Sequence, residues 1–421
     1  MTFGLRAGAV TALIIGACIL SMNSLLAADR QLDPGVSDIE IRIGQTMPYS
    51  GPLSAASMIG KVQAAYFHMI NDRGGINGRK INLISYDDAA MPSKTVEQVR
   101  RLVENDEVLF TFQTLGSASN IAVEKYLNDR RIPQLFVGGR ATRFEDPVNF
   151  PWTMGFAPNL RTEIRVYARF ILDNYPNAKV GLLYQNDESG KGYLTGLKEA
   201  LGSRAGELLV SEASYDVTDP TVDSQVVRFK AAGIDVFINM AAQRFATQVI
   251  RKTAELGWKP VHLIGVGSSS IDAVLVPAGI EHAKGLISAS SFKETADPTW
   301  ADDDGMKRWK AFMDAYYPEG DRKSIFTTYG YSAAELLVQV LRQCGDNFSR
   351  ENIMRQATHL QNVKLDLLLP ELSISTSPTD HRVVKEFRMM RFSDERWSHS
   401  GRSSPIDACG QVQLVAMQDR G

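Results

Sequence analysis

Residues 108–139 read VLFTFQTLGSASNIAVEKYLNDRRIPQLFVGG. Two apolar runs, 108–114 and 133–139, flank the segment 121–131, whose pattern predicts a helix. A strand, a helix and a second strand in this order predict two parallel strands joined by a helix that covers the sheet. Between the first strand and the helix lies a small, hydroxyl-rich turn, 116–119. The backbone N–H groups at such a turn either receive a helix cap or hold an anion.

The same alternation of strand and helix extends over 39–139 and again over 160–267. Its apolar runs are short and lie between longer helical stretches, which is typical of parallel sheets covered on both faces. Two such series predict an α/β protein with two doubly wound parallel-sheet lobes. Ligands of these sheets bind beyond the carboxyl ends of the strands, so the candidate site residues are those that directly follow each apolar run.

The N-terminus has the order of an export signal. Arg6 precedes an apolar stretch, and Ala27 and Ala28 follow it, which predicts a signal peptide over 1–28. A retained membrane helix and a lipid anchor at Cys18 are the alternatives. We therefore expect the mature protein in the periplasm.

The charge balance limits the class of partner. The chain has 421 residues, with 46 basic and 48 acidic side chains and a formal net charge of −2. Because there is no basic excess, the sequence predicts no nucleic-acid partner. The length favours two or three domains.

Two cysteines remain after removal of the predicted signal, Cys344 and Cys409. In an exported protein they are a disulfide candidate. Two free buried thiols are the alternative.

The sequence holds no motif for a phosphate-binding loop, a nucleophile elbow or a zinc site. Gly265-Val266-Gly267 lacks the third glycine of a dinucleotide-binding loop, and the six histidines are scattered. Asp87 and Asp88 follow a strand, where adjacent carboxylates more often hold a turn or cap a helix than act as acid and base. We therefore predict a binding protein without catalytic residues, metal or cofactor.

The loops after the third and fourth predicted strands are suited to a carboxylate. Ser117 and Ser119 each offer a hydroxyl and a backbone N–H, and Gly138 and Gly139 allow close backbone approach. Arg140 adds a positive charge and a planar donor fork. The alternatives are a helix N-cap for the two serines and a surface ion pair for Arg140.

Several motifs together resemble a known family. They are Ser50-Gly51-Pro52 after the first strand, the sequence NDRGGING at 71–78, Asp87-Asp88, Ser117 to Ser119, and Thr327-Thr328-Tyr329. From about residue 38 to about 375, their order resembles that of the periplasmic solute-binding proteins of ABC importers, in the branched-chain amino-acid (leucine/isoleucine/valine-binding) group.

The resemblance implies a type I periplasmic binding protein, with two lobes joined by three crossovers that close on a ligand by hinge motion. It implies a first lobe of 38–156 plus 290–362, a second lobe of 157–289 plus 363–400, and a tail over 401–421. The implied partners are a small-molecule ligand and the permease subunits of an ABC transporter. A ligand-sensing regulator on the same fold is a further alternative.

The resemblance also implies ligand-binding positions. A ligand carboxylate would be held at Ser117 to Ser119, including Ala118, and at the loop from Gly138 to Arg140. The remaining implied positions lie in the other loops around the cleft. They are Ala56, Ser189, Gln243 and Gly267.

Departures from the family pattern concern the ligand class. Gly267 stands where an acidic residue of the amino-acid binders pairs with the ligand ammonium, and Ala56, Ser189 and Ala242 stand where aromatic residues usually lie. A buried ammonium without a partner is costly, so we predict a small organic acid without an α-amino group, such as an aromatic acid. The alternative is an amino acid or amide, with the missing acid supplied by another residue such as Asp187 or Glu188.

Overall fold

The computed structural model describes residues 33–51 and 53–399. The predicted signal peptide, Cys18, Pro52, the predicted tail and Cys409 lie outside the described residues. Within the described ranges no helix is both long enough and apolar enough to cross a membrane.

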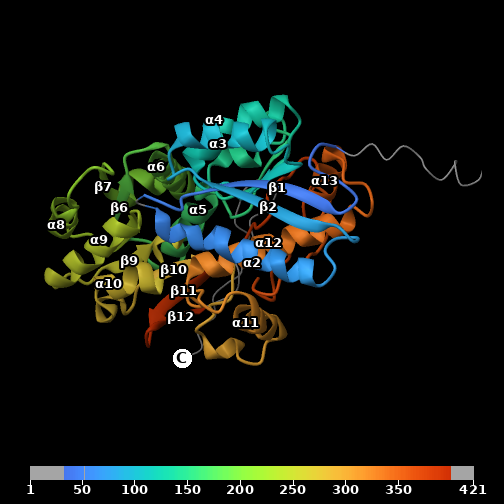
Figure 1. The fold of residues 1–421 in the computed structure, drawn as a ribbon. Coiled ribbons are helices and arrows are strands. Elements are labelled where there is room, and N and C mark those ends of the chain that lie inside the picture. The colour runs from blue at the N-terminus through green and yellow to red at the C-terminus, as the bar shows by residue number, and fades with distance from the viewer. Residues whose placement is uncertain (1–32, 52, 400–421) are drawn as a thin grey trace, which may run out of the picture.

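The first lobe is built on a five-stranded parallel sheet in the order β2-β1-β3-β4-β5. Its strands are β1 (Glu40–Met47), β2 (Lys80–Asp87), β3 (Phe110–Phe112), β4 (Gln134–Val137) and β5 (Thr153–Gly155). Its helices are η1 (Ser54–Ser57), α2 (Met58–Asp72), α3 (Pro92–Glu104), α4 (Ser117–Asp129), η2 (Thr142–Glu145), η7 (Pro298–Trp300), α11 (Asp304–Tyr316), α12 (Ile325–Gln343) and α13 (Arg350–Ala357). Figure 1 shows α3 and α4 on one side of β1 and β2, with α2 and α12 on the other.

The second lobe is built on a seven-stranded sheet in the order β12-β11-β10-β9-β8-β6-β7. Its strands are β6 (Val180–Gln185), β7 (Leu209–Tyr215), β8 (Val236–Met240), β9 (Val261–Ile264), β10 (Ile287–Ser290), β11 (Arg388–Ser393) and β12 (Arg396–His399). Its longer helices are α5 (Leu160–Asn174), α6 (Glu188–Leu201), α8 (Asp223–Ala231) and α9 (Gln243–Glu255). Its short helices are η3 (Gly202–Arg204), α7 (Ala205–Leu208), η4 (Val266–Ser268), η5 (Ile271–Leu275), α10 (Val276–Ala278) and η6 (Ile280–Ala283).

Both faces of the second sheet are buried. Val236 and Ile238 of β8 pack in one hydrophobic cluster with α5 and α6, whereas Phe237 packs in another with α8 and α9. Successive side chains of a strand point to opposite faces, so helices must cover both sides. This arrangement confirms the predicted doubly wound α/β fold.

The second sheet ends in an antiparallel hairpin that the sequence analysis did not predict. Strand β10 pairs antiparallel with β11, and β11 pairs antiparallel with β12. The two residues between β11 and β12, Asp394 and Glu395, have φ values of 49° and 57°. Two consecutive left-handed residues are typical of a type I′ hairpin turn.

Three chain crossings join the lobes. The chain leaves the first sheet after β5, returns after β10, and crosses again between Val384 and β11. The crossings lie side by side, because Val384 donates its backbone N–H to the Phe156 carbonyl and the Phe156 ring stacks on Phe292 at 6.1 Å between centroids. Tyr329 of α12 meets the same Phe156 ring edge-on at 5.1 Å.

The lobe boundaries remain a prediction. The hydrophobic core of the first lobe includes Leu365, Leu372 and Val384. These contacts favour a third crossover after Val384, rather than at residue 363.

Candidate functional site

The loops that follow β3 and β4 meet at one edge of the first sheet. The Gly116 N–H donates to the Gly138 carbonyl at 3.0 Å, and the Arg140 N–H donates to the Ser117 hydroxyl oxygen at 3.1 Å. A Cβ on Gly139 would lie 3.2 Å from the Ser117 Cα. The structure therefore brings Ser117 and the Gly138–Arg140 loop together, because parallel neighbours end at the same edge.

The hydroxyl-rich turn is the first turn of a helix. Helix α4 begins at Ser117, four residues before the predicted segment, and its N-cap is Gly116 with φ of 97° and no side-chain cap. Ala118 is exposed in this turn. The Ser117 hydroxyl accepts from the Arg140 N–H and donates to no residue in the described part of the chain, so its proton is available to another acceptor. An uncapped helix N-terminus of this kind favours a negatively charged group.

Ser119 has a different role from Ser117. Its side chain is 2 % exposed, and its hydroxyl bonds the Thr95 hydroxyl at 2.8 Å. Thr95 in turn donates to Asp88 at 2.8 Å. This hydroxyl is therefore engaged in joining α3 to α4.

Asp87 and Asp88 hold turns, as the less reactive interpretation of this pair predicted. Asp87 accepts from the backbone N–H of Ser50 and of Ala89, and the Ser50 hydroxyl donates to it as well. The Ser50 hydroxyl is the main reason that the pKa of Asp87 is lowered from its usual value. Asp88 accepts from the Ala90 N–H.

Arg140 is not the free cation that the sequence analysis expected. Its Nη1 lies 2.7 Å from the Glu163 Oε2, and Glu163 is fully buried. Its Nε donates to the Pro158 carbonyl at 2.9 Å. Burial lowers the pKa of Arg140, but the adjacent Glu163 carboxylate outweighs it and raises that pKa above its usual value. The guanidinium charge is therefore balanced within the protein.

The Glu163 carboxylate meets three donors, one from the first lobe, Arg140, and two from its own lobe. Besides Arg140, its carboxylate accepts from the Tyr193 hydroxyl at 2.7 Å and from the Val266 N–H at 2.6 Å. Burial, and then the charge of Glu163, raise the pKa of Tyr193 well above its usual value. A carboxylate thus lies against the loop that contains Gly267, at which the acid of the amino-acid binders is missing.

Asp187 and Glu188 were suggested as replacements for the missing acid, but the structure gives them other surroundings. Asp187 caps α6 by accepting from the Gly190 N–H at 2.8 Å and also accepts from the Gln185 amide. Glu188 is exposed in the first turn of α6. The buried acid beside the 265–267 loop is Glu163.

The remaining predicted site positions are only partly brought together. They are Ala56, Ser189, Gln243 and Gly267. Gln243 donates from its side chain to the Gly267 carbonyl at 3.3 Å. A path of contacts therefore runs from Ser117 through the Arg140–Glu163 pair to this loop. Within the part of the chain that the structure describes, no hydrogen bond ties Ala56 or Ser189 to this path. Ala56 is buried in η1, and Ser189 lies in the first turn of α6.

Glu163 and Tyr193 were not identified from the sequence. Asn159 caps α5 by accepting from the Thr162 N–H, so Glu163 resembles an ordinary acidic residue in the first turn of a helix. Its proximity to Arg140 depends on contacts between two lobes. No local sequence signal distinguishes an acidic residue that only stabilises the start of a helix from one that pairs with an arginine of the other lobe.

One donor group of the site has no protein partner. The Arg140 Nη2 is buried and forms no hydrogen bond with any residue in the described ranges. An unpaired buried donor is costly, so a ligand or water oxygen at this position is favoured. Burial raises the pKa of the nearby Tyr329 to about 12, so its hydroxyl stays protonated at neutral pH.

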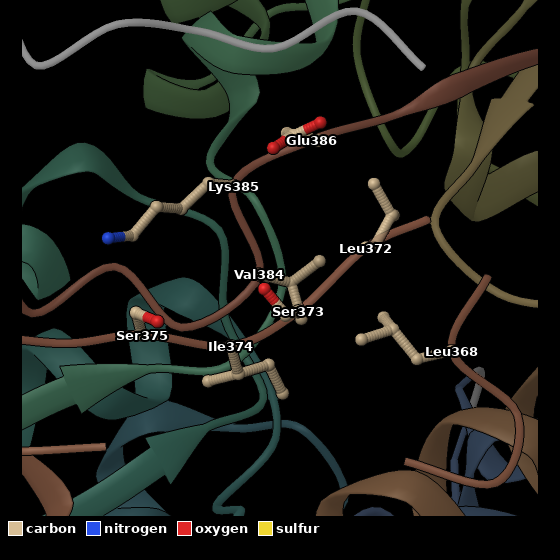
Figure 2. Close-up of a pocket in the computed structure, with 8 residues that line it drawn as sticks. All are labelled: Leu368, Leu372, Ser373, Ile374, Ser375, Val384, Lys385 and Glu386. Atoms are coloured by element: carbon tan, nitrogen blue, oxygen red, sulfur yellow. The ribbon is translucent and has the colours of Figure 1, made fainter. Parts of the chain in front are cut away.

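A small cavity lies elsewhere, beside the third crossing (Figure 2). It has a volume of about 210 Å³. Its lining residues are Leu368, Leu372, Ser373, Ile374, Ser375, Val384, Lys385 and Glu386. None of the predicted site residues lines it, and we do not assign it to the ligand.

Disulfide formation by Cys344 remains a prediction. Its partner Cys409 lies outside the described residues, and within them Cys344 is a free, buried thiol whose Sγ donates to the Val340 carbonyl. Burial raises the pKa of this thiol to about 12.

Comparison of the sequence with known proteins finds a matching family and related proteins. The sequence profile of the periplasmic binding protein family matches residues 40–396. A Leu/Ile/Val-binding protein homolog 1 from Brucella suis biovar 1 is 24% identical over 324 residues, which cover 74% of this chain and 81% of the relative.

Two solved structures show the same fold. The branched chain amino acid ABC transporter protein from Thermus thermophilus, with bound valine, superposes with a TM-score of 0.78 at 17% identity, covering 87% of this chain and 97% of that one. The fatty acid ABC transporter substrate-binding protein from Thermomonospora curvata has a TM-score of 0.76 at 18% identity, with 90% and 95% covered. This chain therefore belongs to the periplasmic binding protein family.

Proposed function

We propose that the protein captures a small carboxylate ligand between its two lobes, for delivery to the permease of an ABC importer. The observation that supports this most is the uncapped start of α4. There the Ser117 hydroxyl proton has no acceptor among the described residues, and the Arg140 backbone N–H contacts the same hydroxyl. The Nη2 of the Arg140 side chain, which extends toward Pro158 and Glu163, is likewise without a partner in the described ranges. Charge-assisted hydrogen bonds of this kind stabilise a carboxylate by about 1.5–3 kcal/mol each.

We propose further that the ligand lacks an α-amino group. Gly267 offers no side chain, and the Glu163 carboxylate already accepts three hydrogen bonds, one from a cation. A ligand ammonium would have to displace one of these donors. The similar fatty acid transporter protein is named for a carboxylate without an amino group.

A second candidate, an amino-acid ligand, is favoured by the position of Glu163. This buried carboxylate lies against the 265–267 loop, and its Oε1 would be 3.7 Å from a Cβ on Gly265. If Arg140 turned to the ligand carboxylate, Glu163 would be free to accept from an ammonium. The similar protein with bound valine belongs to this class.

A thermal-shift panel tests both candidates on protein without residues 1–28. Each carboxylate, for example benzoate, butyrate or leucine, is compared with its primary amide. A ligand at 100 times its Kd adds about 2.7 kcal/mol of stability. We expect shifts with the non-amino carboxylates that exceed those with their primary amides, and no shift with leucine. Shifts with leucine or other amino acids would establish the second candidate, and no shift with any carboxylate would contradict the proposal.

The periplasmic location is also a proposal, supported by family membership and by the N-terminal sequence. Osmotic-shock fractionation of cells expressing the full chain tests it. We expect the protein, shortened at its N-terminus, in the released fraction. Retention with the membrane would favour the anchored alternatives.

A further inference from the structure

We propose that Glu163 is a positioning residue that sets the charge selectivity of the ligand site. It acts through Arg140, by fixing the direction of the guanidinium and by cancelling its charge. This inference rests on the proposed function, because it assumes that the ligand lies at Ser117 and Arg140.

The direction of the guanidinium is fixed at two of its three nitrogens. Nε donates to the Pro158 carbonyl at 2.9 Å, and Nη1 lies 2.7 Å from the Glu163 carboxylate. Of the three nitrogens, only Nη2 has no acceptor among residues 33–51 and 53–399. Because the guanidinium is planar and rigid, these two contacts determine where the free N–H groups point.

The position of Glu163 is itself fixed. Tyr193 and the Val266 N–H hold its two oxygens from the second lobe, and the carboxylate is fully buried. Opposite charges at this distance in a poorly solvated place largely cancel for a third group nearby. A ligand at Nη2 therefore meets a hydrogen-bond donor with little net charge, and only the start of α4 favours an anion. We infer that the wild-type site prefers a carboxylate to its amide only moderately.

A comparable pair, with a buried carboxylate and a more exposed arginine, lies in the first lobe. Glu124 of α4 is also fully buried, and its carboxylate lies 2.6 Å from the Arg143 Nη2. This pair does not contact Ser117 or Arg140 in the described hydrogen bonds and ion pairs. Glu124→Gln therefore controls for the general effect of removing the charge of a buried carboxylate that is paired with an arginine.

The test compares acetate with acetamide as probes, since both are small enough for any cleft at this site. Thermal shifts are measured at constant ionic strength for wild type, Glu163→Gln and Glu124→Gln. We expect Glu163→Gln to raise the ratio of acetate to acetamide affinity about tenfold, because Arg140 is no longer neutralised. Glu124→Gln should keep the wild-type ratio. An unchanged ratio in Glu163→Gln overturns the inference.

If Glu163→Gln is too unstable to measure, Arg140→Gln provides a second test, in which the charge preference of the site should change from anions to cations. It leaves the Glu163 charge unpaired, so we expect methylammonium to stabilise this variant more than wild type, and acetate to lose its effect. No gain with methylammonium overturns the inference. The proposed function fails separately, if no carboxylate of the larger panel stabilises the wild-type protein.

Discussion

Ser117 and Ser119 are two residues apart in α4, yet their hydroxyls meet different partners. Ser117 accepts from the Arg140 backbone and keeps its proton, whereas Ser119 is buried against Thr95. A single turn of helix thus contains one hydroxyl that is free for a ligand and one that holds two helices together.

This difference predicts opposite effects of two similar substitutions. Ser117→Ala should weaken binding of the carboxylate found by the thermal-shift panel about tenfold or more, because a bond to a charged group is lost. Ser119→Ala should leave that Kd unchanged and lower the free energy of unfolding by about 1 kcal/mol. Calorimetric titration and urea unfolding measure the two quantities. Equal Kd values for Ser117→Ala and wild type would exclude Ser117 from the site.

At the residue scale, the sequence predicted the meeting of Ser117 with Gly138 to Arg140. It did so because the carboxyl ends of neighbouring parallel strands share one edge. The pairing of Arg140 with Glu163 could not be predicted, because it joins side chains from different lobes. The charge that seemed available to a ligand is balanced by a carboxylate 23 residues farther along the chain, after a crossover.

At the element scale, β9 contains a buried titratable group. The His262 ring lies against the Phe237 ring, with 4.9 Å between centroids and a tilt of 31°, and its Nε2 lies 3.4 Å from the Asn239 amide nitrogen. Burial lowers the pKa of His262 to about 3, from a usual value of 6.5. The folded state therefore keeps the ring neutral, in a pH range where the unfolded chain takes up a proton.

His262 predicts a loss of stability in acid. Because its folded pKa is depressed, its contribution is complete above pH 6.5 and declines as the pH falls toward 3. We expect a loss of about 2 kcal/mol from this residue between pH 7 and pH 5. His262→Phe should remove that loss in urea unfolding, whereas His68→Gln, at an exposed position, should not. A wild-type pH profile in His262→Phe would assign the acid loss to other groups.

The β11–β12 hairpin shows why one element was not predicted. Type I′ turns usually contain Asn-Gly or Asp-Gly, since both central residues take positive φ. Here the turn is Asp394-Glu395, and glutamate gives no such signal. The strands of the parallel sheets were predicted because their apolar runs alternate with helices, and a short edge hairpin lacks that context.

At the scale of the whole molecule, the two lobes are joined by three adjacent crossings. The Phe156, Phe292 and Tyr329 rings pack where the crossings meet. Rotation of the lobes as rigid bodies about such crossings is the usual closure of this kind of fold.

Closure predicts a more compact molecule with ligand. Small-angle X-ray scattering should show a smaller radius of gyration when the carboxylate from the panel is added to wild type. Ser117→Ala, at the same ligand concentration, should keep the radius of the free protein. An unchanged radius for saturated wild type would mean that the ligand enters a cleft that is already closed.

The crossings also determine when the protein can fold. The core of the first lobe joins Ile43 of β1 to Leu337 of α12 and to Val384, which are far apart in the sequence. As the ribosome releases the chain, β1 to β5 emerge long before α12, and their apolar surface has no partner. Contacts of such long range make folding slow. Both lobes therefore depend on segments that are synthesised late, Val384 for the first lobe and β11–β12 for the second, so neither core is complete until nearly the whole chain has been made.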